Sequence, residues 1–354
     1  MKKIVLFCAI LITFSAFSQT QWQKLTATKA SDFGLSYSLP KTVLVVDVEY
    51  TKTSIKAGQY YRYAEKLLGI TNPILQDSDF YFLDKVSMDA TSAPDKTTGC
   101  MVKFESDLPY IILNSEGVLC AVNTNADSAL AAKIKPLPQN YVVQEATTNS
   151  QLSFTEETLA SGSTAKMAEL AAKQIFRLRE SRLDLLTGDA DQRPKDGEGI
   201  KVVLAEIDKQ EKALTALFTG TTQIEKFYAR TKVYPTETDL NHQVLFRFSK
   251  HFGYVAADDL SGEPVYIDIK ATDRKEFLPD PKAKPNEKHG LAYTIPGKGE
   301  VKISYYGKVL FETEQPFTQF GIQTNFPAEL FTRKKAPAKV IIHPNTGAIV
   351  SLMQ

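Results

Sequence analysis

The chain has 354 residues, 43% hydrophobic and 23% charged, which excludes whole-chain disorder. At roughly 100–200 residues per domain, this length allows two or three domains. Lys and Arg number 42 against 41 Asp and Glu, so the chain lacks the basic surplus of a nucleic-acid-binding protein, and with 4 His and 3 Cys the usual ligands of metal sites are scarce.

An export signal is predicted at the N-terminus. Two lysines precede an almost wholly apolar segment, Ile4–Phe17, and Ala16 and Ser18 are small residues at the positions that signal peptidase reads. We therefore expect residues 1–18 to be removed before Gln19. The alternative is a membrane anchor, but the apolar segment would span only about 21 Å of a ~30 Å bilayer core. No later segment is apolar enough to suggest a transmembrane helix in the mature chain.

Two cysteines, Cys100 and Cys120, follow the export signal. An oxidising compartment favours a disulfide between them. Short strands are expected at residues 101–105, 110–113 and 118–122. In a simple meander these strands would hold the two Cα atoms further apart than the ~7 Å limit for a disulfide. The alternatives are therefore a disulfide in a different strand order and two small buried thiols.

The region that follows the export signal, residues 19–148, is predicted to be a β-rich domain with one short helix. Residues 42–51 alternate apolar and polar side chains, which indicates a half-buried strand. Residues 58–69 change to helical spacing and end at a glycine. Residues 79–88 resemble a second strand, which we expect to end before a turn at Pro94-Asp95.

A helical hairpin is predicted for residues 149–220. Ser163 can cap a helix that runs to about Thr187 and ends at Gly188, and its apolar side chains recur at helical spacing. A polar loop follows, and a second amphipathic helix runs from Ile200 to Phe218. Two helices joined by a short loop are expected to pack antiparallel.

The remaining residues, 221–354, are predicted to form a β-sandwich-like domain. Short alternating segments follow one another with Gly and Pro between them, which is typical of a sandwich or barrel-like sheet. Separate strands are expected at 291–295, 301–305, 308–312 and 321–324, among others. The Pro- and Lys-containing residues 277–289 are expected to be a loop. The predicted fold class is therefore α+β, with two β-rich, sandwich-like lobes separated by a long antiparallel helical hairpin.

Several stretches together resemble an uncharacterised exported family of Bacteroidetes, a domain-of-unknown-function family (family 4831). The resemblance covers nearly all of the chain after the export signal, but none of its motifs is a catalytic signature. It implies location and overall build, and it implies no activity and no functional residues. The stretches that carry it are Leu39–Thr42, YYRYAEKLLG at 60–69, Pro94-Asp95, the helix KMAELAAKQIFRLRESRLDLLTGD, the segment 244–265 and the C-terminal motifs IPGKGEVKISYYG, FGIQ and HPNTGAI.

The densest acidic cluster is the loop between the two predicted helices, where Asp189, Asp191, Asp196 and Glu198 are weak candidates for a Ca²⁺ site. An EF-hand loop would need an acid or amide, a glycine and a glutamate at positions that hold Arg193, Pro194 and Ile200 here. The alternative interpretation is a solvated connection whose acids favour the second helix dipole. We expect no metal and no cofactor.

No other pattern predicts a catalytic site. The histidines lack zinc-hydrolase spacing, and no nucleophile-elbow or phosphate-binding glycine motif is present. Asp258, Asp259 and Glu263 are neighbouring carboxylates of the kind a glycosidase uses, but their turn-like context favours a structural role. Local aromatic clusters such as 60–63, 80–82 and 305–306 indicate packing or exposed binding faces.

The sequence therefore favours an exported protein of the cell envelope, located in the periplasm, at the outer membrane or outside the cell. We expect it to bind a partner protein or a glycan, or to act as a scaffold, without catalysing a reaction. The alternative is a hydrolase that acts on an envelope polymer through carboxylates brought together from distant loops. The sequence indicates no ligand identity and no oligomeric state.

Overall fold

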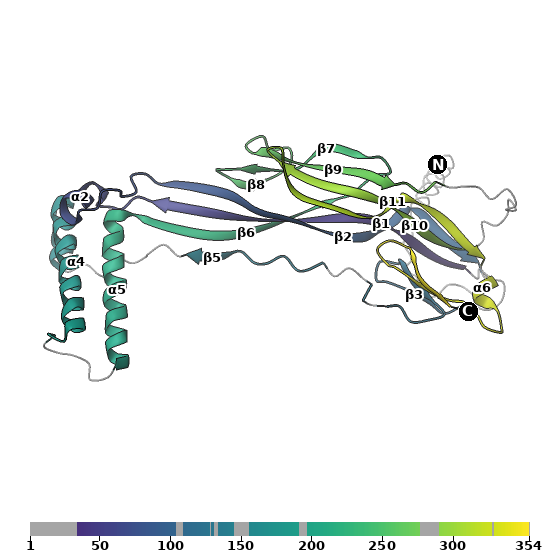
Figure 1. The fold of residues 1–354 in the computed structure, drawn as a ribbon, viewed down its shortest axis with the longest axis horizontal. Coiled ribbons are helices and arrows are strands. Elements are labelled where there is room, and N and C mark those ends of the chain that lie inside the picture. Colours follow the sequence, from purple (N-terminus) through teal and green to yellow (C-terminus); the bar gives the residue numbers. More distant parts are fainter. Residues whose placement is uncertain are drawn as a thin grey trace, which may run out of the picture.

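The computed structural model describes residues 34–103, 109–127, 129–130, 134–144, 156–190, 197–276, 290–327 and 329–353. The expected export signal and the expected loop at 277–289 lie outside these residues. Figure 1 shows an elongated molecule in which β-sheets follow the long axis and two long helices project across it at one end. The β-rich build with a long helical hairpin is as predicted.

Sheet A runs along most of the molecule and is antiparallel throughout. The long strand β1 lies between β2, which pairs with it from end to end, and β6, whose ladder with β1 stops where Val233 meets Leu44. On the N-terminal side of Leu44, β6 no longer pairs with this edge of β1, so other parts of the chain can contact the edge there. In spatial order the strands are β2 (Ser78–Lys103), β1 (Gly34–Lys56), β6 (Thr221–Val233) and β5 (Tyr141–Gln144).

The alternating sequence of β1 produces two different faces, as its pattern predicts. Leu44, Val46 and Val48 are fully buried on one face. On the opposite face, the Asp47 carboxylate accepts two hydrogen bonds from the Arg230 guanidinium on β6, at 2.6 and 2.7 Å. The face of Leu44, Val46 and Val48 is available for a second sheet. The opposite face also buries Val43 and Val45, and its charged residue Asp47 is paired within sheet A.

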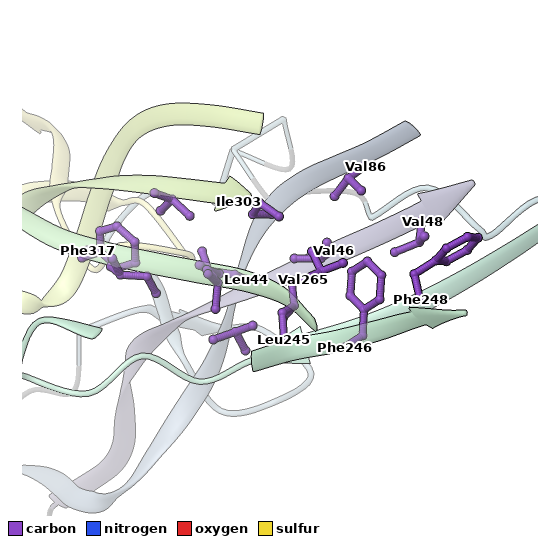
Figure 2. Close-up of a cluster of buried hydrophobic side chains, with 14 of the residues drawn as sticks. Leu44, Val46, Val48, Val86, Leu245, Phe246, Phe248, Val265, Ile303 and Phe317 are labelled. Atoms are coloured by element: carbon purple, nitrogen blue, oxygen red, sulfur yellow. The ribbon is translucent and has the colours of Figure 1, made fainter. Parts of the chain in front are cut away.

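Sheet C packs on the apolar face of sheet A, and the central core lies between them. Figure 2 shows Phe246 and Phe248 lying against Val46 and Val48 of β1. Each such buried side chain contributes about 1.5–3 kcal/mol relative to exposure. In spatial order the strands are β11 (Lys308–Pro327), β10 (Gly290–Tyr305), β9 (Glu263–Asp273), β7 (Leu240–Ser249) and β8 (Gly253–Val255).

Sheet B lies at the end of the molecule far from the long helices (Figure 1). Its core joins Leu119 and Val340 to the first residues of β1, where the Tyr37 hydroxyl donates to Ala292 O at 3.0 Å and accepts from Ala292 N–H at 2.6 Å. The elements are β13 (Ile349–Met353), β12 (Lys339–Ile342), β4 (Leu119–Val122) and β3 (Ile111–Leu113), with the short helix α6 (Glu329–Thr332) beside them.

The helical hairpin occupies the other end and confirms the sequence prediction closely. The Ser163 hydroxyl accepts the Lys166 N–H at the start of α4, and Gly188 ends that helix with a φ of 91°. The two long helices are antiparallel, because Arg179 and Arg182 of α4 form ion pairs with residues of α5. The helical elements are η1 (Tyr61–Tyr63), α2 (Ala64–Leu68), α3 (Glu156–Ala160), α4 (Thr164–Thr187) and α5 (Gly197–Thr219).

The root of the hairpin has its own core, whereas its outer part is largely exposed. Tyr60, Ile175, Leu214 and Phe218 are fully buried where the two helices meet η1 and α2. Further out, large apolar side chains such as Leu183 are exposed. Among the described helices, none has the length and apolar character needed to cross a membrane.

The two separate β-rich lobes expected at residues 19–148 and 221–354 are not formed. Sheet A pairs β1 with β6, and sheet B pairs β4 with β12, so strands from before and after the hairpin share both sheets. The physical reason is that a long strand such as β1 exposes two hydrogen-bonding edges, and β6 satisfies the edge that β2 leaves free. The hairpin consequently lies at the end of sheet A and does not separate two lobes.

Several expected turns are also absent, because strands run through them. β2 continues through Pro94. Proline has no backbone N–H to donate, and an edge strand such as β2 tolerates it because the backbone groups on its outer edge pair with no other strand. The expected strands at 291–295 and 301–305 are one strand, β10, with a register shift at Gly297. Those at 308–312 and 321–324 are likewise one strand, β11.

Candidate binding groove

The candidate site is a groove where β1 parts from β6 and the β6–β7 loop crosses to sheet C. Its first compartment has a volume of about 1040 Å³ and is lined by the loop residues 235–238, Arg274 and Lys275, and β11 residues 318–321. A second compartment of about 670 Å³ adjoins it and adds Pro94, Lys96, Glu116 and Tyr234. The two compartments share Lys41, Asp95, Pro235 and Gln319.

The groove exists because the open edge of β1 is closed by side chains and not by another strand. The Thr42 N–H donates to Thr318 Oγ1 at 2.9 Å, and the Thr318 N–H donates to Thr42 Oγ1 at 3.0 Å. The Gln319 amide donates to Thr42 O at 2.8 Å and to Pro235 O at 3.2 Å. These bonds fix β11 against β1 and satisfy the backbone at Thr42.

An ion pair lies where the two compartments meet. The Asp95 side chain is almost fully buried, and its Oδ1 lies 3.1 Å from the Nζ of Lys41, which is about half exposed. Each residue follows a proline in its strand, and Pro40 is the β1 partner of Pro94 in the ladder. The Lys41 ammonium lies beside the buried carboxylate, so each group compensates the charge of the other.

The far wall of the first compartment is held by Arg274. Its guanidinium lies 4.6 Å from the ring centroid of the buried Phe320, forms an ion pair with Asp239 at 2.6 Å and donates to Glu237 O. The backbone N–H of Ala271 also donates to Asp239, and this hydrogen bond is the main cause of the lowered pKa of that carboxyl. These contacts connect the β6–β7 loop, through Glu237 and Asp239, to Arg274, which directly follows β9.

The rim carries an exposed aromatic side chain. Tyr234 follows the last residue of β6 and precedes the buried Pro235, and 64% of its surface is exposed. The loop next to it is closed locally, since the Thr236 hydroxyl lies 3.1 Å from that of Thr238. A ring held at the mouth of a polar groove can contact the apolar face of a ligand.

The groove is equipped for hydrogen bonding more than for reaction chemistry. Its walls contain threonine hydroxyls, glutamine amides and charged groups, and among the residues that the structure describes no histidine or cysteine lines either compartment. Three described carboxyl groups, Asp79, Asp239 and Asp259, have a pKa lowered chiefly by hydrogen bonds. A general acid at neutral pH would need the opposite displacement.

The acidic loop proposed as a Ca²⁺ site is only partly described. Asp189 accepts the Thr187 hydroxyl at 2.8 Å, and Glu198 pairs with Lys201 at 2.7 Å. Asp191 and Asp196 lie outside the described residues. Within the part of the chain that is described, no three His, Cys, Asp or Glu side chains lie close enough to hold a metal ion.

The two cysteines are free thiols on different sheets. Cys100 lies on β2 opposite Tyr37, and Cys120 is buried on β4, where its thiol donates to Val118 O at 3.5 Å. Burial raises the pKa of both thiols. The expected meander is not formed, because residues 101–103 extend β2 alongside β1 and do not pair with β3.

Other singled-out residues lie away from the groove. Asp259 accepts the Ser261 N–H at 2.9 Å in the β8–β9 loop, and no groove residue comes from that loop. Tyr60 is buried at the hairpin root, whereas Phe82 and Tyr306 are exposed. These aromatic clusters therefore divide between packing and surface exposure.

Sequence reasoning did not identify the groove residues. Lys41, Asp95, Arg274 and Gln319 are far apart in the chain, and each is an ordinary surface-type residue in its own segment. A partial signal exists, since Lys41 and Asp95 lie in two of the stretches that carry the family resemblance. That signal alone does not place the two stretches side by side.

Comparison with known proteins identifies a family and no function. The chain belongs to the family described as "Domain of unknown function (DUF4831)", which matches residues 33–350. No curated protein matches the chain. No solved structure matches it either.

Proposed function

We propose that the protein is an exported, non-catalytic binding protein of the cell envelope, and that it holds a partner protein or a glycan in the groove. The observation that carries the proposal is that separate chain segments build one hydrogen-bonding groove whose walls are already fixed by internal bonds. Thr42, Thr318 and Gln319 fix one wall, and Arg274 fixes another. A site fixed before binding loses little conformational entropy when the ligand enters.

The proposed location is supported by the sequence of residues 1–18, whose two lysines, apolar segment and small residues match a cleaved export signal. The periplasm, the outer membrane and the medium are all reached by such a signal. Fractionation of the native host, followed by immunodetection of the chain, tests this part. Recovery of the chain in the cytoplasm contradicts it.

The alternative, a hydrolase of an envelope polymer, has one observation in its favour. Asp95 and Glu237 come from distant segments and line the same groove, as that mechanism requires. Against it, the Asp95 carboxyl is almost fully buried and already paired with Lys41, so it has little access to a substrate in the groove. Turnover of peptidoglycan or polysaccharide that is abolished by Glu237→Gln would establish the hydrolase.

Site-specific photo-crosslinking tests the groove in the intact cell. A benzophenone side chain is placed at Tyr234, on the rim, or at Tyr110, which has a similar exposure of 60% but lies outside both compartments. We expect an adduct from position 234 and none from position 110. The same adducts from both positions, or none from either, would contradict binding at the groove.

A further inference from the structure

We infer that the ligand of the groove is a neutral oligosaccharide, which stacks a sugar ring on Tyr234 and passes the Lys41–Asp95 pair into the first compartment. This inference rests on the proposed function, because it names the ligand class of the same site. It excludes an acidic polymer and an extended peptide as the ligand.

The first argument is the charge of the lining. Each of the described basic side chains that line the first compartment, Lys41, Arg274 and Lys275, already has a carboxylate partner, so none of the three offers an uncompensated positive charge. The remaining charged groups of the lining are Lys96, Glu116 and Glu237, which nearly balance. A polyanion would need a surplus of unpaired positive charge in the groove, because only such charge offsets the free-energy cost of removing its anionic groups from water. The ion pairs are Lys41–Asp95 at 3.1 Å, Arg274–Asp239 at 2.6 Å and Lys275–Asp273 at 2.5 Å.

The second argument is that the strand edge at the groove is closed. An extended peptide is commonly bound as an added strand, through main-chain hydrogen bonds to an open edge. At Thr42 the N–H is taken by Thr318 and the C=O by Gln319. On the opposite wall, the Lys275 N–H donates to Phe320 O at 3.0 Å. A peptide main chain that entered the groove at Thr42 would therefore meet side chains, and it would find no free backbone N–H or C=O of Thr42 to pair with.

The third argument is the pairing of an aromatic rim with short polar side chains. A sugar ring has an apolar C–H face and a circumference of hydroxyl groups, each both a donor and an acceptor. Tyr234 offers an exposed ring, and the adjoining walls offer Thr236, Thr238 and Gln323. The half-exposed Lys41 ammonium, beside its buried partner Asp95, adds a hydrogen-bond donor where the two compartments meet.

The size and shape of the groove favour a chain of sugars over a single one. The first compartment alone, at about 1040 Å³, reaches the upper end of the ~300–1,000 Å³ typical of small-ligand pockets. The second compartment continues from it past the shared residues Lys41 and Gln319. Tyr234 lies at the second compartment, so a ligand stacked there extends naturally into the first.

The inference is tested by calorimetric titration of the purified full chain with a fixed panel. The probes are neutral cello-, xylo-, malto- and chito-hexaose, an acidic oligogalacturonate and a proline-rich peptide. We expect at least one neutral hexaose to bind. Tyr234→Ala should weaken that binding about tenfold, which corresponds to about 1.4 kcal/mol of stacking. Tyr234→Phe should retain it within about threefold, and Tyr110→Ala should leave it unchanged.

The outcomes separate this inference from the proposed function. Binding of the oligogalacturonate or the peptide in a Tyr234-dependent way, with no neutral sugar bound, overturns the inference and leaves the groove as the binding site. Binding of no probe overturns the inference, and if position 234 also yields no adduct in the cell, the proposed function falls with it. Neutral-sugar binding that Tyr234→Ala does not weaken contradicts the stacking geometry.

Discussion

Thr42 and Thr318 exchange reciprocal hydrogen bonds, each backbone N–H donating to the hydroxyl oxygen of the other residue, at 2.9 and 3.0 Å. The two residues are separated by 276 positions in the chain and lie on different sheets. Their pairing substitutes for the ladder that β6 would have continued along β1. The groove is the space that this substitution leaves.

Removal of the Thr42 hydroxyl is expected to destabilise the fold. Thr42→Val keeps the side-chain shape but leaves the Thr318 N–H without its acceptor at a nearly buried site. We expect a loss of about 1–3 kcal/mol in the free energy of unfolding, measured by urea denaturation. Thr318→Ser retains the hydroxyl and should lose less than about 1 kcal/mol. Equal losses for the two variants would show that the exchanged bonds do not matter.

Gly297 is expected to be required for the register shift in β10. A Cβ at this position would lie 2.3 Å from Phe320 O and 2.4 Å from Asp273 O, and both are backbone atoms that cannot rotate away. Gly297→Ala should therefore cost several kcal/mol and distort the Arg274 wall. Gly197→Ala, where a Cβ meets nothing within 4 Å, is the matched control and should be neutral or slightly stabilising. A Gly297→Ala protein with wild-type stability would contradict the close approach.

The hairpin core predicts a contrast between inner and outer positions. Ile175→Asp buries an unpaired charge where the wild-type side chain is fully buried, so a loss of about 3 kcal/mol or more is expected. Leu204 is only half-buried, and Leu204→Asp should cost less. Lys173→Asp and Lys209→Asp, on exposed positions, should stay within about 0.5 kcal/mol. Similar thermal unfolding of inner and outer variants would show that the apolar stripe is misassigned.

His343 is expected to make the fold sensitive to mild acid. Burial lowers the pKa of its imidazole, and its Nδ1 accepts the Asn345 N–H at 3.2 Å, so the folded state favours the neutral ring. The unfolded chain then binds more protons than the folded one below pH ~6.5, and stability rises with pH. The stabilisation is fully present above that pH and is lost as the pH falls through the lower, folded pKa.

The measurement is the melting temperature at pH 7.5 and pH 5.0. The wild-type chain should lose more stability over this interval than His343→Gln does, whereas the exposed His251→Gln should behave as the wild type. An unchanged pH dependence in His343→Gln would assign the effect to other groups.

The proposed export signal predicts a defined N-terminus. Protein purified from the native host should begin at Gln19, because Ala16 and Ser18 are the small residues that a signal peptidase requires. Ser18→Leu should leave uncleaved precursor, whereas the same change at Ser15 should be tolerated. Detection of Met1 on a membrane-bound form of the wild-type chain would refute cleavage.

Local patterns predicted the helices well, because helix boundaries depend on nearby residues. Ser163, Gly188 and Gly220 mark the ends of the long helices in the sequence and in the structure. Strand boundaries were less accurate, since Pro94 and Gly297 are tolerated inside strands when an edge or a register shift accommodates them. Local composition does not reveal such accommodation.

Pairing between distant strands was not predictable from one sequence. The alternation of β1 indicates which side chains are buried, but it does not reveal that β6, beyond the hairpin, covers one edge. The groove depends on this same pairing, because Lys41, Asp95 and Arg274 meet only once β1, β2 and the end of β9 are assembled. Its residues carry no motif of their own, and the geometry alone identifies them.

The partnership of β4 with β12 has a consequence for how the chain folds. These two strands pair Val122 with Val340, so sheet B closes a loop of more than two hundred residues. A topology dominated by such distant contacts folds in milliseconds to seconds, or more slowly, because closure entropy is lost before the contacts form. A chain synthesised or translocated from its N-terminus would expose the apolar residues of β4 and of the start of β1, such as Leu39 and Leu119, until β12 arrives. During that interval these residues would be a natural target for a holdase chaperone.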